Sequence, residues 1–378
     1  MINPRLQYLS LADNCLSGSV PSTISAFNQS LTSLYLSLNL FTGLILSHLL
    51  TTETVLKTID VSYNMFSGSI PSTAGNWVYL EYMYLYNNYF TGPIPPETAY
   101  MTQTTEMLLQ YNFLSGPMPN VLVTGDFLQI FNCRTNFISG TIPSNIGYYG
   151  NLTSVDNTDN LFHGTLPYSV GNLQILALLS MSINRFSGVL PQSLGSLTSL
   201  VTLLLHSNYF SGTSGPMFAS EYGSLEAFDI SDNNFKGPLP DHVFKLPLIE
   251  VVSLARNCFT GTIPTNICSA SNLQKLSMSG LSSGSNCIRP VFFPVSSGIY
   301  TSTYMQGSIP DCILQLPNLL GLEMSGNALT GVIPALPHDS RLVNLSLSHN
   351  RLKGTIPESF GPHFKFGVMD LSFNKVYY

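Results

Sequence analysis

The chain has 378 residues, of which only 9% are charged, and its formal net charge is −6 at pH 7. Its hydrophobic content of 44% is too high for a disordered chain. Lys and Arg form no runs. This argues against a nucleic-acid partner, because proteins that bind nucleic acids usually present a basic surface. No apolar stretch reaches the roughly 18 residues of a membrane span, and no signal peptide precedes the first repeat.

One pattern recurs along the whole sequence. A clear copy begins at Leu176 and reads L-x-x-L-x-M-x-x-N-x-F-x-G-x-L-P. Its Asn returns every 23 to 25 residues, with one longer gap, at Asn14, Asn39, Asn64, Asn88, Asn112, Asn136, Asn160, Asn184, Asn208, Asn233, Asn257, Asn327, Asn350 and Asn374. A degenerate fifteenth copy has Leu281 in place of Asn. Because repeats stack on one another into one body, we expect a single domain, 1–378, rather than two or three.

Each part of the pattern predicts a structural element. The segment L-x-x-L-x-L alternates like a strand with one buried face, so stacked copies predict a parallel sheet of about 15 strands. The Asn amide offers two donors and an acceptor, enough to bond backbone groups of its own and the adjacent coil. The apolar residue that follows is often Phe, which predicts a buried aromatic spine at Phe41, Phe66, Phe90, Phe162, Phe186, Phe210, Phe235 and Phe259. Gly and Pro then predict a bend and a short 3₁₀ or α turn.

The full pattern resembles the plant-type leucine-rich repeat. This repeat occurs in the ectodomains of plant receptor-like kinases and receptor-like proteins and in polygalacturonase inhibitors, and similar repeats occur in surface antigens of kinetoplastid flagellates. The resemblance implies an α/β repeat solenoid: a right-handed superhelix with a concave parallel sheet that binds partners and a convex side of short turns. Plant-type ectodomains usually carry terminal caps. This chain shows none, so we expect a piece of a longer surface protein or a truncated gene model.

The repeats depart from the pattern in two informative places. Leu46 stands where Pro is expected in the second copy. An insert at 282–306 separates the degenerate copy from the next one. In its placement the insert resembles the island that some plant receptors use for ligands, but it is much shorter, so a looped-out surface insertion is the favoured interpretation. In an oxidising compartment we expect Cys287 in the insert to pair with Cys268 or Cys312.

Residues between the inward Leu positions should point to the concave face. Tyrosines gather there on the second to fifth strands, and acidic residues recur along the same face. Tyr is common in binding sites because it offers a large contact area with few rotatable bonds. The predicted ligand-binding residues are Tyr35, Asp60, Tyr63, Tyr82, Tyr84, Tyr86, Glu106, Tyr111, Asp156 and Asp229. The alternative is that the tyrosines only stabilise neighbouring strands.

The sequence offers no catalytic constellation. The carboxylates lack a basic partner or a metal-ligand cluster, so an acidic row facing solvent or ligand is the favoured interpretation. The seven His are scattered without a zinc or triad motif. We therefore expect no enzyme activity, no metal and no cofactor in this chain. Three sequons predict N-glycosylation at Asn28, Asn151 and Asn344.

These observations favour an extracellular or cell-surface recognition module. It would bind a peptide, glycan or protein on the concave face, as part of a receptor-like protein, with no role for nucleic acid. One alternative is an inhibitor of a secreted enzyme such as a pectinase, and another is a structural or adhesive surface antigen. A kinase domain or membrane anchor would lie in a longer parent chain. The sequence identifies neither the ligand nor the oligomeric state.

Overall fold

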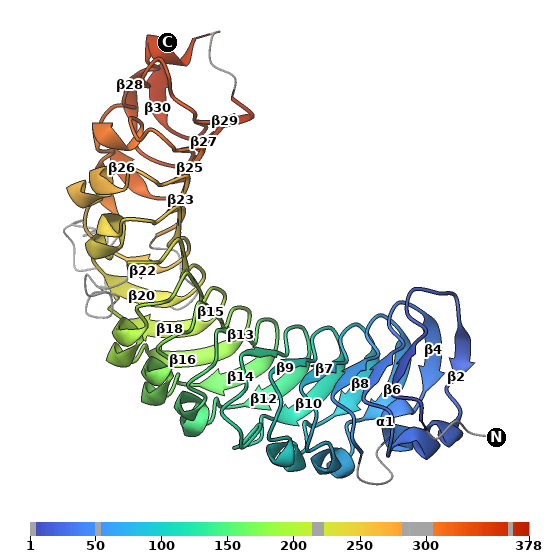
Figure 1. Ribbon diagram of the computed structural model, residues 1–378. Coiled ribbons are helices and arrows are strands. Elements are labelled where there is room, and N and C mark those ends of the chain that lie inside the picture. Colours follow the sequence, from blue (N-terminus) through green and yellow to red (C-terminus); the bar gives the residue numbers. More distant parts are fainter. Residues whose placement is uncertain are drawn as a thin grey trace, which may run out of the picture. The chain divides into compact units, whose positions relative to one another are not determined.

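The computed structural model describes residues 5–49, 54–213, 223–281, 287, 305–361 and 366–377. The chain divides into two compact units, Met1–Phe186 (unit 1) and Ser187–Tyr378 (unit 2). Each unit is a stack of coils, with one coil for each sequence repeat (Figure 1). None of the helices in the described residues has the length and apolar character needed to cross a membrane.

The L-x-x-L-x-L segments form the predicted parallel strands, which we call the first sheet, and the strand order follows the chain order. In unit 1 they are β1 (Tyr8–Ser10), β3 (Ser33–Tyr35), β5 (Thr58–Asp60), β7 (Tyr82–Tyr84), β9 (Glu106–Leu108), β11 (Ile130–Asn132), β13 (Ser154–Asp156) and β15 (Leu178–Ser180). In unit 2 they are β17 (Thr202–Leu204), β19 (Ala227–Asp229), β21 (Val251–Ser253), β23 (Lys275–Ser277), β25 (Gly321–Glu323), β27 (Asn344–Ser346) and β29 (Val368–Asp370). Within the described ranges this gives fifteen strands, which confirms the predicted number.

A second parallel sheet, which the repeat pattern did not predict, follows the Asn of each coil. Its strands in unit 1 are β2 (Ser17–Ser19), β4 (Leu40–Gly43), β6 (Met65–Ser69), β8 (Tyr89–Gly92), β10 (Phe113–Pro117), β12 (Phe137–Gly140) and β14 (Leu161–Gly164). Strand β16 (Arg185–Val189) contains the boundary between the units. In unit 2 the strands are β18 (Tyr209–Gly212), β20 (Asn234–Gly237) and β22 (Cys258–Phe259), with the separate pairs β24 (Gln306–Ser308) and β26 (Ala328–Thr330), and β28 (Lys353–Thr355) and β30 (Lys375–Tyr377).

Short helices form the turns on the other side of most described coils, as predicted, although the coils before β11 and β27 have none. The 3₁₀ helices are Ser22–Phe27, Ser72–Asn76, Pro96–Tyr100, Ser144–Tyr148 and Tyr168–Asn172 in unit 1, and Gln192–Ser196, Asp241–Lys245, Thr265–Ser269, Asp311–Ile313 and Glu358–Phe360 in unit 2. Each follows a Pro at the N-cap position. The α-helix α1 (Ile45–Leu49) occurs in the coil where Leu46 replaces Pro. Leu, unlike Pro, has a backbone N–H and a free φ angle, so the helix can begin at Ile45.

The buried Asn of each coil joins that coil to its neighbour, and Asn160 is a representative case. Its Nδ2 donates to the Cys133 carbonyl of the preceding coil at 2.9 Å and to the Asn157 and Thr158 carbonyls of its own coil at 3.3 and 3.2 Å. Its Oδ1 accepts from the Ile138 N–H of the preceding coil at 2.9 Å. One side chain thus bonds four backbone groups, three of which also accept a second hydrogen bond from a neighbouring coil or turn. We call the series of these residues the Asn ladder.

The ladder holds a strained turn in place. In thirteen described coils the residue before the ladder Asn is not Gly and yet has φ between 50° and 58°. These residues are Asp13, Leu38, Tyr63, Asn87, Tyr111, Thr135, Asp159, Ile183, Ser207, Asp232, Arg256, His349 and Phe373. A non-Gly residue in this left-handed region costs roughly 1–2 kcal/mol, and side chains branched at Cβ fit it poorly. The hydrogen bonds of the adjacent Asn hold the chain in this conformation.

The aromatic spine lies where the pattern predicts it. The side chains of Phe66, Phe162 and Phe186 are fully buried. Phe162 stacks on Phe186 with ring centroids 6.0 Å apart, and Phe41 stacks on Phe66 at 5.9 Å. In unit 2 the rings of Phe210 and Phe235 are 6.4 Å apart. These rings fill the space between the two sheets. Because the stacked rings belong to successive coils, a coil buries its apolar residues against its neighbour.

The predicted pairing of Cys287 with Cys268 or Cys312 is wrong. Cys287 forms a disulfide with Cys258, and Cys268 forms one with Cys312. Cys268 and Cys312 lie in the short helices of successive coils, so stacking brings their Cα atoms to 5.5 Å. Cys258 begins β22, where its Cα is 5.3 Å from that of Cys287. Of the insert 282–306, only Cys287 and the last two residues belong to the described part of the chain.

We predict that Asn160→Ala lowers the free energy of unfolding by about 1 to 3 kcal/mol, because it removes the hydrogen bonds of a buried amide to its own coil and to the preceding coil. Urea unfolding followed by circular dichroism measures this change. Asn172→Ala, an exposed Asn in the helix Tyr168–Asn172, is the matched control and should change it by less than about 0.5 kcal/mol. Equal losses for the two variants would contradict the role of the ladder.

We also predict that Ile183→Asn raises the free energy of unfolding by about 1 kcal/mol, because Asn tolerates the left-handed turn better than Ile. Ile175→Asn is the control, since Ile175 is equally exposed (46% against 45%) but is not among the positive-φ residues. Denaturant titration of the three proteins checks this result. A destabilised Ile183→Asn variant would show that the turn is not strained.

Candidate ligand-binding faces

The solvent side of the first sheet, which we call the sheet face, carries the predicted tyrosines of unit 1. Strand pairing places Tyr35, Asp60 and Tyr84 in one row across β3, β5 and β7. Tyr84 lies between the rings of Tyr82 and Tyr86, with centroids 6.2 and 6.5 Å away. The structure thus brings these tyrosines into one cluster, as the alternation of strand side chains indicates.

Two further predicted residues join this tyrosine cluster. The ring of Tyr63 meets that of Tyr86 edge to face, with centroids 5.4 Å apart. The Tyr84 hydroxyl donates to Glu106 Oε2 at 2.8 Å. Burial, and then the hydrogen bond to Glu106, raises the pKa of Tyr84 well above its ordinary value. A neutral phenol bound to a carboxylate gives this face a polar anchor among aromatic rings.

Tyr63 and Tyr111 differ from the other predicted tyrosines. Both occupy the left-handed turn before a ladder Asn rather than a strand of the first sheet. Their side chains are 49% and 44% exposed, respectively. Sequence spacing alone does not distinguish these turn positions from strand positions, because no particular residue type occurs at the end of the strand.

The predicted acidic residues have a structural role on their own coils. Oδ1 of Asp60 accepts from the N–H and the hydroxyl of Ser62, at 3.0 and 2.6 Å. Asp229 binds Ser231 in the same way, and Asp156 accepts from the Thr158 N–H. Each carboxylate closes a turn two residues long at the end of its strand, as Asp commonly does. None of the described residues forms a group of three or more His, Cys, Asp or Glu that could hold a metal ion.

Unit 2 contains a hollow of about 410 Å³ on its sheet face, which we call the serine hollow. Asp229 of the predicted set lies at its wall, and strand pairing continues this row through Ser253 and Ser277 to Glu323. The small residues Ser253, Ala255, Ser277 and Ser279 line the hollow, together with Ser231, Val251 and Val252. The absence of bulky side chains at these positions creates the depression.

Charged groups border the serine hollow. The Arg256 guanidinium pairs with the Asp232 carboxylate, and Ser277 donates to Glu323 Oε2 at 2.9 Å. Lys275 is exposed on the same wall. The hollow therefore offers hydroxyl groups within it and charges of both signs around it. Sequence reasoning identified only Asp229 here, although small residues repeated at equivalent positions were a readable indication.

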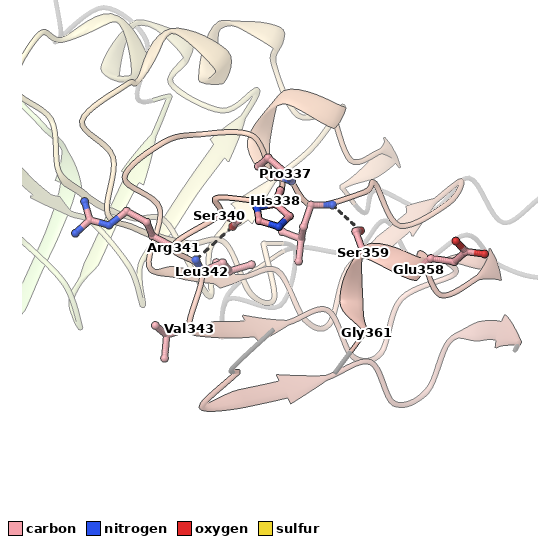
Figure 2. Close-up of a pocket in the computed structure, with 10 residues that line it drawn as sticks. Pro337, His338, Ser340, Arg341, Leu342, Val343, Glu358, Ser359 and Gly361 are labelled. Atoms are coloured by element: carbon pink, nitrogen blue, oxygen red, sulfur yellow. Dashed lines mark hydrogen bonds between the residues drawn. The ribbon is translucent and has the colours of Figure 1, made fainter. Parts of the chain in front are cut away.

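A larger cavity of about 530 Å³ lies among Leu336, Pro337, His338 and Ser359 near the end of unit 2. Figure 2 shows Arg341 and Glu358 pointing away from it on opposite sides. The Ser359 hydroxyl accepts from the Leu336 N–H at 2.9 Å and so connects two coils (Figure 2). Its lining reaches Gly361, and the next residues, 362–365, lie outside the described part of the chain. We assign no ligand to this cavity.

The three predicted glycosylation sites differ in accessibility. Asn28 is buried, and its Nδ2 donates to the Leu49 carbonyl at 3.1 Å. The predicted glycan at Asn28 is therefore wrong for the folded chain, because the nitrogen that would carry it faces the interior. Asn151 and Asn344 are exposed, so glycosylation there stays a prediction.

Comparisons with known proteins show what this chain is similar to. The model of the family described as Leucine Rich Repeat matches residues 5–27, 55–77, 79–101, 224–246 and 341–362. The chain is similar to Receptor-like protein 54 of Arabidopsis thaliana, with 33% identity over 150 residues that cover 39% of this chain and 19% of the relative. The chain thus spans about a fifth of this relative's length.

Two solved structures match almost the whole chain. One is the plant peptide hormone receptor RGFR1 in complex with RGF2, with 28% identity and a TM-score of 0.88, covering 99% of this chain and 56% of that one. The other is the ectodomain of the Arabidopsis receptor kinase HAESA in complex with an IDA peptide hormone ligand, with 29% identity and a TM-score of 0.85, covering 99% and 58%. Both are plant receptors, the second of them a leucine-rich repeat ectodomain, and the chain shares their fold.

We predict that Tyr84 ionises at higher pH than an ordinary tyrosine, because burial and Glu106 favour its neutral form. The folded chain then keeps a proton that the unfolded chain loses, so this residue makes stability fall as the pH rises above about 10. The phenolate absorbance of the wild type minus that of Tyr84→Phe measures the ionisation. Glu106→Gln should move it to lower pH. Ionisation of Tyr84 near pH 10 in the wild type would contradict the prediction.

Proposed function

We propose that this chain, whose leucine-rich repeats are of the plant receptor type, is the extracellular recognition part of a receptor-like protein. It binds a peptide in the serine hollow of unit 2 and performs no catalysis itself. The observation that carries the proposal is a polar hollow of about 410 Å³ on the sheet face. The peptide-bound receptors that the chain resembles support the same class of ligand.

The chemistry of the hollow suits an extended peptide. A peptide backbone presents a donor and an acceptor at each residue, and these must find partners when they leave water. The hydroxyl groups of Ser253, Ser277 and Ser279 can act as donors and acceptors. Their small size lets a backbone approach the first sheet closely, which bulky side chains would prevent.

The charges around the hollow give it selectivity. Lys275 can bind a carboxylate of the peptide, and Asp229 and Glu323 can bind a cationic side chain. Asp232 and Arg256 form an ion pair with each other, so their two charges already have partners. We expect a ligand with charges of both signs, because matched pairs favour the correct partner and like charges exclude others.

The tyrosine cluster of unit 1 remains a separate proposal. Tyr35, Tyr82, Tyr84 and Tyr86 offer a rigid aromatic surface suited to a protein partner. The tyrosine cluster is tested as a competing site. If the peptide binds in the serine hollow, substitutions in the tyrosine cluster should leave its affinity unchanged.

A peptide display library selected on the immobilised wild-type chain tests the proposal. Enriched peptides should lose at least tenfold in affinity for Ser253→Trp and Ala255→Trp, because an indole fills the hollow. Ser211→Trp, on the second sheet of unit 2, and Tyr84→Ala in unit 1 are the controls and should bind normally. Calorimetry measures the affinities, and unfolding curves verify that each variant is folded.

Two outcomes would count against this function. Enriched peptides that lose affinity for Tyr84→Ala and not for Ser253→Trp would move the site to the tyrosine cluster. A library without enriched peptides, together with inhibition of a secreted pectinase by the chain, would favour the inhibitor alternative.

A further inference from the structure

Unit 1 presents an exposed apolar surface beside the Asn ladder. It consists of the residues directly before and after the ladder Asn in five successive coils. We call it the lateral patch. Eight of its ten positions are apolar or aromatic: Leu38, Leu40, Tyr63, Met65, Tyr89, Tyr111, Phe113 and Phe137. Asn87 and Thr135 complete it. The eight side chains are each 39% to 51% exposed.

The second sheet holds the patch in a regular array. Strands β4, β6, β8, β10 and β12 pair in this order, and Figure 1 shows them side by side in unit 1. The rings of Tyr89 and Phe113 stack with centroids 5.8 Å apart, and those of Phe113 and Phe137 with centroids 6.1 Å apart. The Asn between the two rows is buried, whereas the eight apolar residues beside it are exposed, and Tyr63 also contacts Tyr86 of the tyrosine cluster. The result is a ridged apolar surface with the period of the coils.

The patch is large for the surface of an isolated protein. An aromatic side chain has about 150–250 Å² of surface, so five half-exposed rings contribute roughly 500 Å². Leu38, Leu40 and Met65 enlarge it further. The largest apolar patch on a typical monomer measures about 300–600 Å², and a standard interface buries about 800 Å² per partner. The lateral patch therefore approaches the area that one subunit of a stable dimer buries.

We propose that the partner is a second copy of this chain, bound patch to patch around a two-fold axis. None of the ten patch positions carries an ionisable carboxylate or a cationic group. Two chains of net charge −6 can therefore meet over these ten positions without an acidic group between them, although Asp13 and Asp159 occupy the equivalent positions in the two flanking coils. The ridges of one copy have the same spacing as the grooves of the other, so they can interdigitate over all five coils.

The centre of the patch favours an identical partner. Asn87 lies in the third of the five coils, and in a two-fold contact the central residue meets its own copy. A side-chain amide both donates and accepts, so two Asn87 side chains can form reciprocal hydrogen bonds. A glycan is disfavoured as the occupant. It would lie on ring faces, whereas stacking turns the faces of Tyr89, Phe113 and Phe137 toward one another.

Sedimentation equilibrium of the full chain over a range of concentrations tests this proposal. The wild type should form a dimer, and Phe113→Lys should weaken dimerisation roughly 100-fold or more, because it buries two charges in the interface. Phe127→Lys is the matched control. Phe127 is 52% exposed but lies outside the patch, so its replacement should leave the dimer intact. Equal unfolding midpoints for the two variants would establish that both are folded.

A cysteine variant tests the position of the axis. In a Cys15→Ser background, which removes the exposed free thiol, Asn87→Cys should form a disulfide-linked dimer under mild oxidation. Asn172→Cys, exposed at the end of a short helix and outside the patch, should form no disulfide-linked dimer under the same conditions. A wild type that remains monomeric at all concentrations would overturn the proposal and leave the patch to a different protein. A dimer that Phe113→Lys does not weaken would overturn it as well.

Discussion

The rest of the structure depends on one Asn amide, buried in eleven of the described coils. The ladder Asn bonds carbonyls of its own turn and both a carbonyl and an N–H of the preceding coil. It therefore fixes the turn and the contact between coils with the same side chain. This coupling explains why bulky residues such as Tyr63 and Ile183 can remain in a left-handed conformation. At Leu281, which has no amide, the backbone carbonyl of Leu281 accepts from the Phe259 N–H at 2.7 Å, a role that the Asn Oδ1 has in other coils.

Much of the fold could be predicted because its supporting residues point inward. Leu, Asn and Phe recur at fixed positions, and each type has one physical role in a stacked coil. The second sheet was missed because its strands follow from the ladder turn and the coil spacing, and their outward residues vary freely from Leu40 to Phe137. The disulfides were missed for a related reason. Cys258 is close to Cys287 through stacking, which separation along the chain does not reveal.

The candidate sites were less predictable than the fold. The tyrosine cluster follows from strand alternation, so Tyr82, Tyr84 and Glu106 could be placed in advance. The turn positions of Tyr63 and Tyr111 could not, because the end of a three-residue strand has no marker. The serine hollow is defined by missing bulk at Ser253 and Ala255, and small residues form no motif. Burial of Asn28 depends on a neighbouring coil and not on its own sequon.

A division of labour follows from this architecture. Inward residues maintain the stack, and we propose that the sheet face carries recognition and the side beside the ladder carries assembly. Hydrogen exchange of the free and peptide-bound chain, read by mass spectrometry, tests this division most directly. The account predicts that amides bound by the ladder, such as that of Phe162, are already protected in the free chain. Peptide binding should then add protection only around β19 to β25. Ladder amides that become protected only when the peptide binds would contradict it.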